Sequence, residues 1–130
     1  SYVEGENIFI SPNGNGNKRP VKYYNGNCHY SNLMALILPK NSWEHKVNKK
    51  YIYYFLKSFQ EHIENNYQRG SCNLTLDIKN FNRMKIPIPT IEIQENFCQD
   101  ITCLEKSVLE QEKELVKNKM KLNSHIFKYL

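Results

Sequence analysis

Cationic, amide and aromatic side chains gather beside three turns of this chain, and their types suit contact with nucleic acid. Arginine can bind guanine through two hydrogen bonds, asparagine can bind adenine in the same way, and lysine more often binds phosphate. Recognition residues also tend to lie on loops that a rigid scaffold holds in place. The candidates are Lys18, Arg19, Lys22 and Tyr23 beside an Asn/Gly loop, Arg69, Ser71 and Asn73 around Gly70, and Arg83 before a predicted strand.

Each candidate also has a plainer interpretation. A single cationic or amide residue at a turn is at least as often a solvated surface side chain, and tyrosines in patterned segments more often pack in a core than stack on bases. We predict base or phosphate contact for the three arginines and phosphate contact for Lys18 and Lys22.

The charge is unevenly distributed along the chain. Residues 1–90 hold twelve Lys and Arg against six Asp and Glu, a net charge of +6, whereas residues 91–130 hold six against seven, a net charge of −1. A basic domain on a nearly neutral helix is typical of a module that binds a polyanion, because phosphate neutralisation supplies most sequence-independent affinity for DNA. Lysines that simply keep a small domain soluble are the alternative.

Sequence signatures of catalysis are missing. The chain has no Walker-type phosphate loop, no His-Glu-x-x-His, no Gly-x-Ser-x-Gly and no Asn/Asp-Pro-Pro-Tyr/Phe box. The four cysteines show no Cys-x-x-Cys pair and no histidine at metal-ligand spacing, so we expect reduced thiols and no metal site. The sequence predicts a protein that is not an enzyme and needs no cofactor.

The elements that must position the candidate residues are short. An apolar strand at 7–11 leads through the Asn/Gly loop into a second strand at 18–24, which predicts a hairpin. Residues 28–38 are expected to form a buried central strand, and Asn48 is expected to cap a helix that runs to about residue 65. A short strand at 74–76, one helical turn capped by Asp77 and a last strand at 84–88 complete an α+β domain over residues 1–90.

Residues 91–130 contain no proline or glycine and predict one long helix of coiled-coil type. One heptad seam is apolar throughout, while the second turns polar at Gln111 and Asn118, which favours a differently patterned partner over an ordinary parallel zipper. About forty residues of helix would reach about 60 Å, too long for the small domain to cover. The predicted pairing residues are Phe97, Ile101, Leu104, Val108, Leu115 and Leu122.

The stretch around the two prolines resembles a known family. A glycine-containing turn, an apolar segment, a Pro-x-Pro corner and a Glu-x-Gln step before a long helix resemble the end of a target-recognition domain in the DNA specificity subunit of type I restriction-modification systems. The matching residues are Gly70, Ser71, Leu76, Phe81, Met84, Lys85, Ile86, Pro87, Ile88, Pro89, Ile91, Glu92 and Gln94. The segment from Gly5 to Leu56 is similar to the central part of such a domain.

This resemblance implies a target-recognition domain over residues 1–90 that reads part of a double-stranded DNA site. The helix over residues 91–130 would pair with a second recognition domain or a second copy, and would offer a surface to the modification (methyltransferase) and restriction subunits, which carry the methyl donor and the nuclease chemistry. Family domains carry a further N-terminal segment before the strand at Asn7. Because this chain begins at Ser1 in mid-pattern, we expect that it was cut from a longer polypeptide.

Two other functions remain open. The chain could be a protein-interaction or oligomerisation module derived from a recognition domain, or the specificity domain of a single-chain DNA methyltransferase or restriction enzyme. A pure assembly module has no need for the concentrated positive charge. No apolar run approaches the roughly 20 residues that cross a bilayer, and no leader precedes the first strand, so we expect a soluble, cytoplasmic protein.

Overall fold

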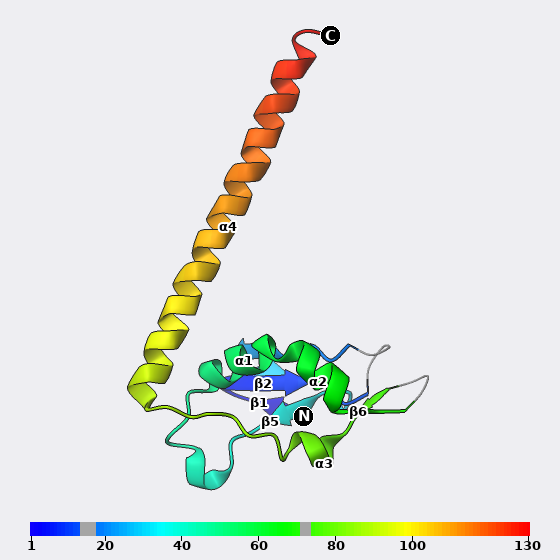
Figure 1. The fold of residues 1–130 in the computed structure, drawn as a ribbon, viewed down its shortest axis with the longest axis vertical. Helices are drawn as coiled ribbons and strands as arrows, with labels where there is room; N and C mark the ends of the chain where they lie inside the picture. The colour runs from blue at the N-terminus through cyan, green and yellow to red at the C-terminus, as the bar shows by residue number, and fades with distance from the viewer. Residues whose placement is uncertain (14–17, 71–73) are drawn as a thin grey trace. The chain divides into compact units, whose positions relative to one another are not determined.

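The structure is a computed structural model that describes residues 1–13, 18–70 and 74–130 (Figure 1). The chain divides into two compact units, Ser1–Glu95 and Asn96–Leu130. The first unit combines short strands with short helices, and the second continues one long helix. The predicted α+β class with a long C-terminal helix is therefore confirmed.

Strand β2 (Glu6–Ile10) is the centre of the main sheet. It pairs antiparallel with β3 (Lys22–Asn25) on one side and with β5 (Ala35–Ile37) on the other. Four consecutive residues of β2 are buried, from Asn7 to Ile10, because both faces of this strand are covered. The predicted hairpin between the first two segments of the chain is therefore present, although pairing in its second strand begins only at Lys22.

The prediction of a buried central strand over residues 28–38 is wrong. This stretch divides into β4 (Cys28–His29), which pairs with β1 (Tyr2–Val3), and the half-buried edge strand β5. A turn separates them, in which Met34 N–H donates to the Ser31 carbonyl at 3.1 Å. The turn interrupts an otherwise apolar run, and β2 occupies the centre instead.

Helices α1 (Lys49–Ser58) and α2 (Gln60–Asn66) lie over one face of this sheet (Figure 1). Asn48 caps α1 as predicted, since its side chain accepts from Tyr51 N–H at 3.1 Å. The expected single helix is interrupted at Phe59. There the hydroxyl of Ser58 donates to the carbonyl of Phe55 at 2.7 Å, a side-chain bond that competes with the helical backbone ladder.

The apolar core of the first unit lies between α1, α2 and the sheet. Its fully buried members come from three elements: Ile8 and Ile10 from β2, Leu56 from α1 and Ile63 from α2. These positions agree with the strand and helix periodicities of the sequence, so the core is the part of the fold that apolar patterning predicts best.

The segment before the long helix is extended but unpaired. A 3₁₀ turn at Asn41–Trp43 and the single turn of α3 (Ile78–Phe81) precede it in the chain, and Asp77 caps α3 as predicted. The predicted strand over residues 84–88 is not formed, because Pro87 and Pro89 lack the N–H groups that a ladder requires. Tyr51 instead donates its hydroxyl to the Pro87 carbonyl at 2.7 Å.

Helix α4 (Ile91–Phe127) begins directly after this segment. Gln94, in its first turn, is fully buried and bridges three backbone groups: it accepts from Asn48 N–H at 2.7 Å and donates to the carbonyls of Lys46 and Pro89 at 2.9 and 2.8 Å. One amide therefore joins the start of α1 to the start of α4, within the first unit.

Candidate nucleic-acid interface

The cationic residues predicted to contact phosphate lie on an extended segment that precedes β3. Lys18, Pro20 and Lys22 are exposed, whereas Arg19 and Val21 are buried. This is the alternation of an extended chain, whose successive side chains point to opposite faces. Lys18 and Lys22 therefore share the outward face, about 13 Å apart along the chain at 3.3 Å per residue.

Arg19 differs from the other predicted contacts because its side chain is 0% exposed. Its guanidinium donates to the Lys18 carbonyl at 2.8 Å, inside the unit. The structure thus places Arg19 where it supports the segment from beneath, and direct contact with a nucleic acid would require the segment to move.

Two side chains of α2 fasten this segment. Glu64 accepts from Arg19 N–H at 3.0 Å, and Gln60 accepts from Val21 N–H at 3.1 Å while its amide donates to the Arg19 carbonyl. Gln60 also donates to Glu64 at 2.9 Å, so the two acceptors hold each other in position. Sequence reasoning missed both residues, although their i,i+4 spacing on a predicted helix was a signal that they share a face.

The Glu64 side chain is only 11% exposed, yet its surroundings favour the ionised carboxylate. Desolvation raises the pKa of Glu64, but the hydrogen bonds from Arg19 N–H and the Gln60 amide and the charge of Lys18 outweigh it. The pKa of Glu64 therefore lies below its ordinary value. Lys18 Nζ lies 3.5 Å from the carboxylate while its side chain remains 76% exposed, so the lysine can still present charge to a partner.

Arg69 is the exposed cation of the β6–β7 hairpin, which joins Gln68–Arg69 to Thr75–Leu76. Its Nε lies 2.8 Å from Asp77 Oδ2, and its side chain is 64% exposed. Desolvation raises the pKa of Asp77, but the hydrogen bonds from Arg69 and Asn80 outweigh it and hold that pKa below its ordinary value. Asp77 thus orients Arg69 through one nitrogen, while most of the arginine side chain stays exposed.

The described residues that flank the two candidate loops meet at one end of the first unit. Asn13 forms a β-bridge with Thr75, and Leu76 N–H donates to the Pro12 carbonyl at 2.8 Å. Gly70 adopts a φ of 108°, a left-handed conformation that favours glycine at this turn. We call this surface the loop end, defined by Asn13, Lys18, Arg69 and Thr75.

The other predicted contacts have different surroundings. Ser71 and Asn73 lie outside the residues that the structure describes. Tyr23 is half-buried, its hydroxyl donates to Glu6 at 2.8 Å and its ring lies 5.5 Å from that of Tyr53, so it supports the sheet. Arg83 is exposed but follows α3 and lines a separate groove, away from the loop end.

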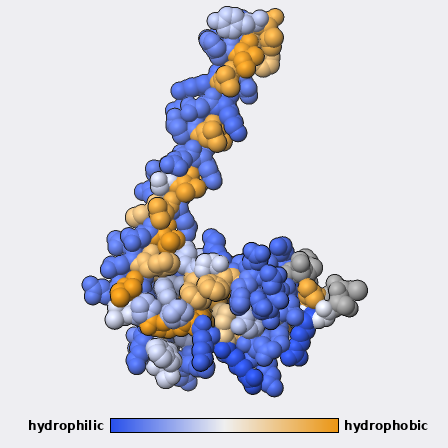
Figure 2. Space-filling model, viewed as in Figure 1, coloured by the Kyte–Doolittle hydropathy of each residue, from blue (hydrophilic) through white to orange (hydrophobic). Residues whose placement is uncertain are grey.

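The predicted pairing residues of α4 form an apolar stripe along the second unit (Figure 2). Phe97, Leu104, Val108, Leu115 and Leu122 are 40–62% exposed, and Ile101 is half-exposed. A second apolar group lies roughly 120° around the helix at 3.6 residues per turn. It comprises Leu109, Val116, Met120 and Phe127, all of which are exposed.

The described residues contain no cluster of three His, Cys, Asp or Glu side chains that could hold a metal ion. Cys28, Cys98 and Cys103 belong to no disulfide, and Cys72 lies outside the described residues. Within residues 1–13, 18–70 and 74–130, no helix combines the length and the apolar character that crossing a membrane requires.

Comparison with known proteins identifies the family of the chain. The family model of the type I restriction modification DNA specificity domain matches residues 1–118, which covers the first unit and much of α4. No curated protein and no solved structure matches the chain significantly. The match extends over most of the sequence, and the chain belongs to the type I restriction modification DNA specificity domain family.

Proposed function

We propose that the first unit reads part of a double-stranded DNA site with its loop end, as a non-catalytic component of a type I restriction-modification system. The observation that carries this proposal is the bridge between Asn13 and Thr75, which brings together two chain segments distant in sequence, each of which carries an exposed cation, Lys18 or Arg69. Lys18 and Lys22 bind phosphate, and Arg69 reaches a base edge or a phosphate. Ser71 and Asn73 belong to the same loop as Arg69 and remain proposed base contacts.

Arg19 has a positioning role in this proposal. Because it is buried beneath Lys18, it holds the outward lysines in register and is not counted among the contacts. Arg83 and Tyr23 are likewise not counted among the DNA contacts of the loop end. Arg83 lines the separate groove, and the Tyr23 hydroxyl donates a hydrogen bond to Glu6.

Helix α4 has an assembly role in this proposal. Its main apolar stripe pairs with a second copy or a second recognition domain, and its second apolar group offers a surface to the modification subunits. Methyl transfer and DNA cleavage then belong to the modification and restriction subunits, so this chain itself binds no cofactor. A single-chain enzyme that carries this domain would use the same loop end.

The test is binding of the chain to duplex DNA over a salt series. Changing Lys18, Lys22 and Arg69 together to Gln should weaken binding and lower the slope of log K against log salt by about 2 to 3, since each phosphate contact contributes about 0.9. The matched control changes the exposed Lys57, Lys79 and Lys106 to Gln, which removes the same charge elsewhere and should alter the slope by less than about 1.

The same measurement discriminates the second candidate function, a module whose only role is assembly. The exposed apolar stripe of α4 favours that function. If the wild-type chain shows no DNA binding at low salt, or if the two triple variants lose binding equally, the loop end is not a recognition surface and the assembly role alone remains.

A further inference from the structure

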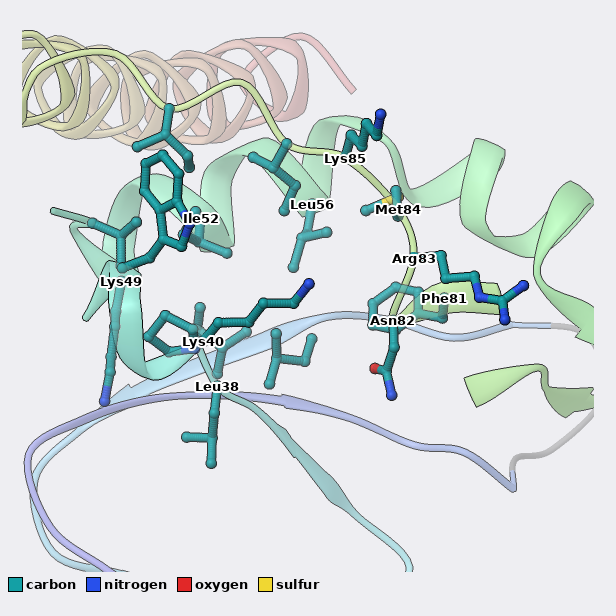
Figure 3. Close-up of a pocket in the computed structure, with 17 residues that line it drawn as sticks. Leu38, Lys40, Lys49, Ile52, Leu56, Phe81, Asn82, Arg83, Met84 and Lys85 are labelled. Atoms are coloured by element: carbon teal, nitrogen blue, oxygen red, sulfur yellow. The ribbon is translucent and has the colours of Figure 1, made fainter. Parts of the chain in front are cut away.

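A groove of about 730 Å³ lies in the first unit, lined by residues outside the proposed loop end (Figure 3). Its floor is formed by branched and aromatic side chains from the sheet, from α1 and from α3, including Ile8, Ile37, Ile52, Leu56 and Phe81. One wall is the extended segment Met84–Ile88, in which Ile86 and Ile88 are half-buried while Lys85 is exposed. The volume is within the range of a binding site for a small molecule or a short peptide.

The charge around this groove has one sign. Lys40, Lys49, Arg83 and Lys85 line it, and no Asp or Glu is among the described residues that do so. Lys40 extends over the groove between Leu38 and Leu56, whereas Arg83 and Lys85 point outward at its rim (Figure 3). Among the described residues none of these four cations forms an ion pair with a carboxylate, although Lys49 Nζ donates to the Glu6 carbonyl at 3.0 Å.

An apolar floor with a cationic rim selects a ligand that combines apolar side chains with negative charge. A nucleobase fits poorly, because its polar edge would be buried against apolar groups, and the one amide of the lining, Asn82, points away from the floor (Figure 3). An aliphatic side chain next to a carboxylate fits both features, since the first fills the floor and the second reaches the cations.

The backbone of the groove favours an extended peptide. Strand β5 is an edge strand of the three-stranded sheet. The Met84–Ile88 wall contributes side chains and not a ladder, because Pro87 lacks an N–H, its carbonyl accepts from Tyr51, and Met84 N–H donates to the Phe81 carbonyl. Unpaired backbone donors and acceptors on an edge strand can bind an added strand, while pockets beside it accept alternate side chains. We propose that this groove binds an extended, acidic and aliphatic segment of a partner protein, independently of the loop end.

The probe is a fluorescein-labelled nonapeptide that alternates Glu and Leu, titrated with the full chain and followed by fluorescence anisotropy. Saturable binding is expected, about tenfold tighter than that of a Glu/Ser peptide or a Lys/Leu peptide. In the chain, Lys40→Glu with Lys85→Glu should weaken binding about tenfold, because the charge of the rim is reversed. The matched control is Lys57→Glu with Lys79→Glu, at exposed positions outside the groove, which should change affinity less than about twofold.

A third variant tests the apolar contact without altering charge. Trp43→Ala, at a residue that is 44% exposed and lines the groove, should weaken binding of the Glu/Leu peptide and leave the folded state intact by circular dichroism. Amide resonances of Ile37–Lys40 and Lys85–Ile88 should shift on binding. The proposal is overturned if no saturable binding occurs up to millimolar peptide, or if both charge-reversal pairs act equally.

The experiment also separates this groove from DNA recognition. If duplex DNA displaces the peptide and Lys40→Glu with Lys85→Glu weakens DNA more than peptide, the groove is part of the DNA surface and the peptide proposal fails. If DNA leaves the peptide bound, and the triple variant of Lys18, Lys22 and Arg69 binds the peptide with normal affinity, the two surfaces are independent. That conclusion holds whether or not the triple variant still binds DNA.

Discussion

At the scale of single residues, the lysine segment depends on one carboxylate. Glu64 binds Arg19 N–H, the Gln60 amide and, more weakly, Lys18. All three interactions favour the ionised form, and together they lower the pKa of Glu64 despite its desolvation. Ionised Glu64 therefore stabilises the folded state above the pKa of an unfolded glutamate, about 4.3, and loses that contribution as the pH falls through its lower folded-state pKa.

This linkage predicts how Glu64→Gln behaves. At pH 7 the variant should have a lower free energy of unfolding than the wild type, and the difference should shrink as the pH falls below about 4, where the wild-type carboxylate also takes up a proton. Urea unfolding of both proteins at pH 7, 5, 4 and 3 measures this difference in the free energy of unfolding. Glu61→Gln, an exposed position on the same helix, is the control, and a difference that stays constant with pH would contradict the linkage.

The sequence could identify these residues only in part. The caps at Asn48 and Asp77 were predictable, because a cap involves residues three apart in the chain. The burial of Arg19 was not, because its neighbours Gln60 and Glu64 are more than forty residues away and only the fold brings them together. The alternation of an extended segment shows that Lys18 and Arg19 face opposite ways, but not which of them faces outward.

At the scale of elements, the crossing from the sheet to α4 is held by polar contacts. The Pro-x-Pro segment cannot join a ladder, so Tyr51 and Gln94 bind its carbonyls instead. Gln94 is the last residue of the Glu-x-Gln step that resembles a family motif. Its structural role is to form hydrogen bonds with three backbone groups through one side-chain amide. A strand at 84–88 was predicted from apolar content, and the prediction failed because the two prolines outweigh it.

Gln94→Ala tests this junction. The substitution leaves Asn48 N–H and two carbonyls without their partner in a buried place, which should lower the free energy of unfolding by about 2–4 kcal/mol. Gln99→Ala, on the exposed surface of the same helix, should change it by less than about 0.5 kcal/mol. Urea unfolding of both variants decides the matter, and equal stabilities would show that solvent replaces the Gln94 contacts at little cost.

At the scale of the whole molecule, a basic first unit is combined with a helix that exposes apolar stripes. Neither feature explains the other, because a DNA reader needs no apolar stripe and an assembly helix needs no basic domain. Together they suit a protein that uses α4 to bring two recognition units to one DNA molecule. Binding by two linked units gains affinity through effective concentration, without any new contact to DNA.

Pairing through α4 therefore predicts a dependence on DNA length. On a duplex of about 40 base pairs, the wild-type chain should bind at least about tenfold more tightly than Leu115→Glu with Leu122→Glu, which places charge in the main stripe and should sediment as a smaller species. On a duplex of about 12 base pairs, which has room for one unit, the two proteins should bind alike. Gln99→Glu with Asn123→Glu adds the same charge outside that stripe and should behave as wild type on both duplexes. If the stripe variant weakens binding equally on both lengths, the added charge acts on DNA directly and pairing does not contribute to recognition.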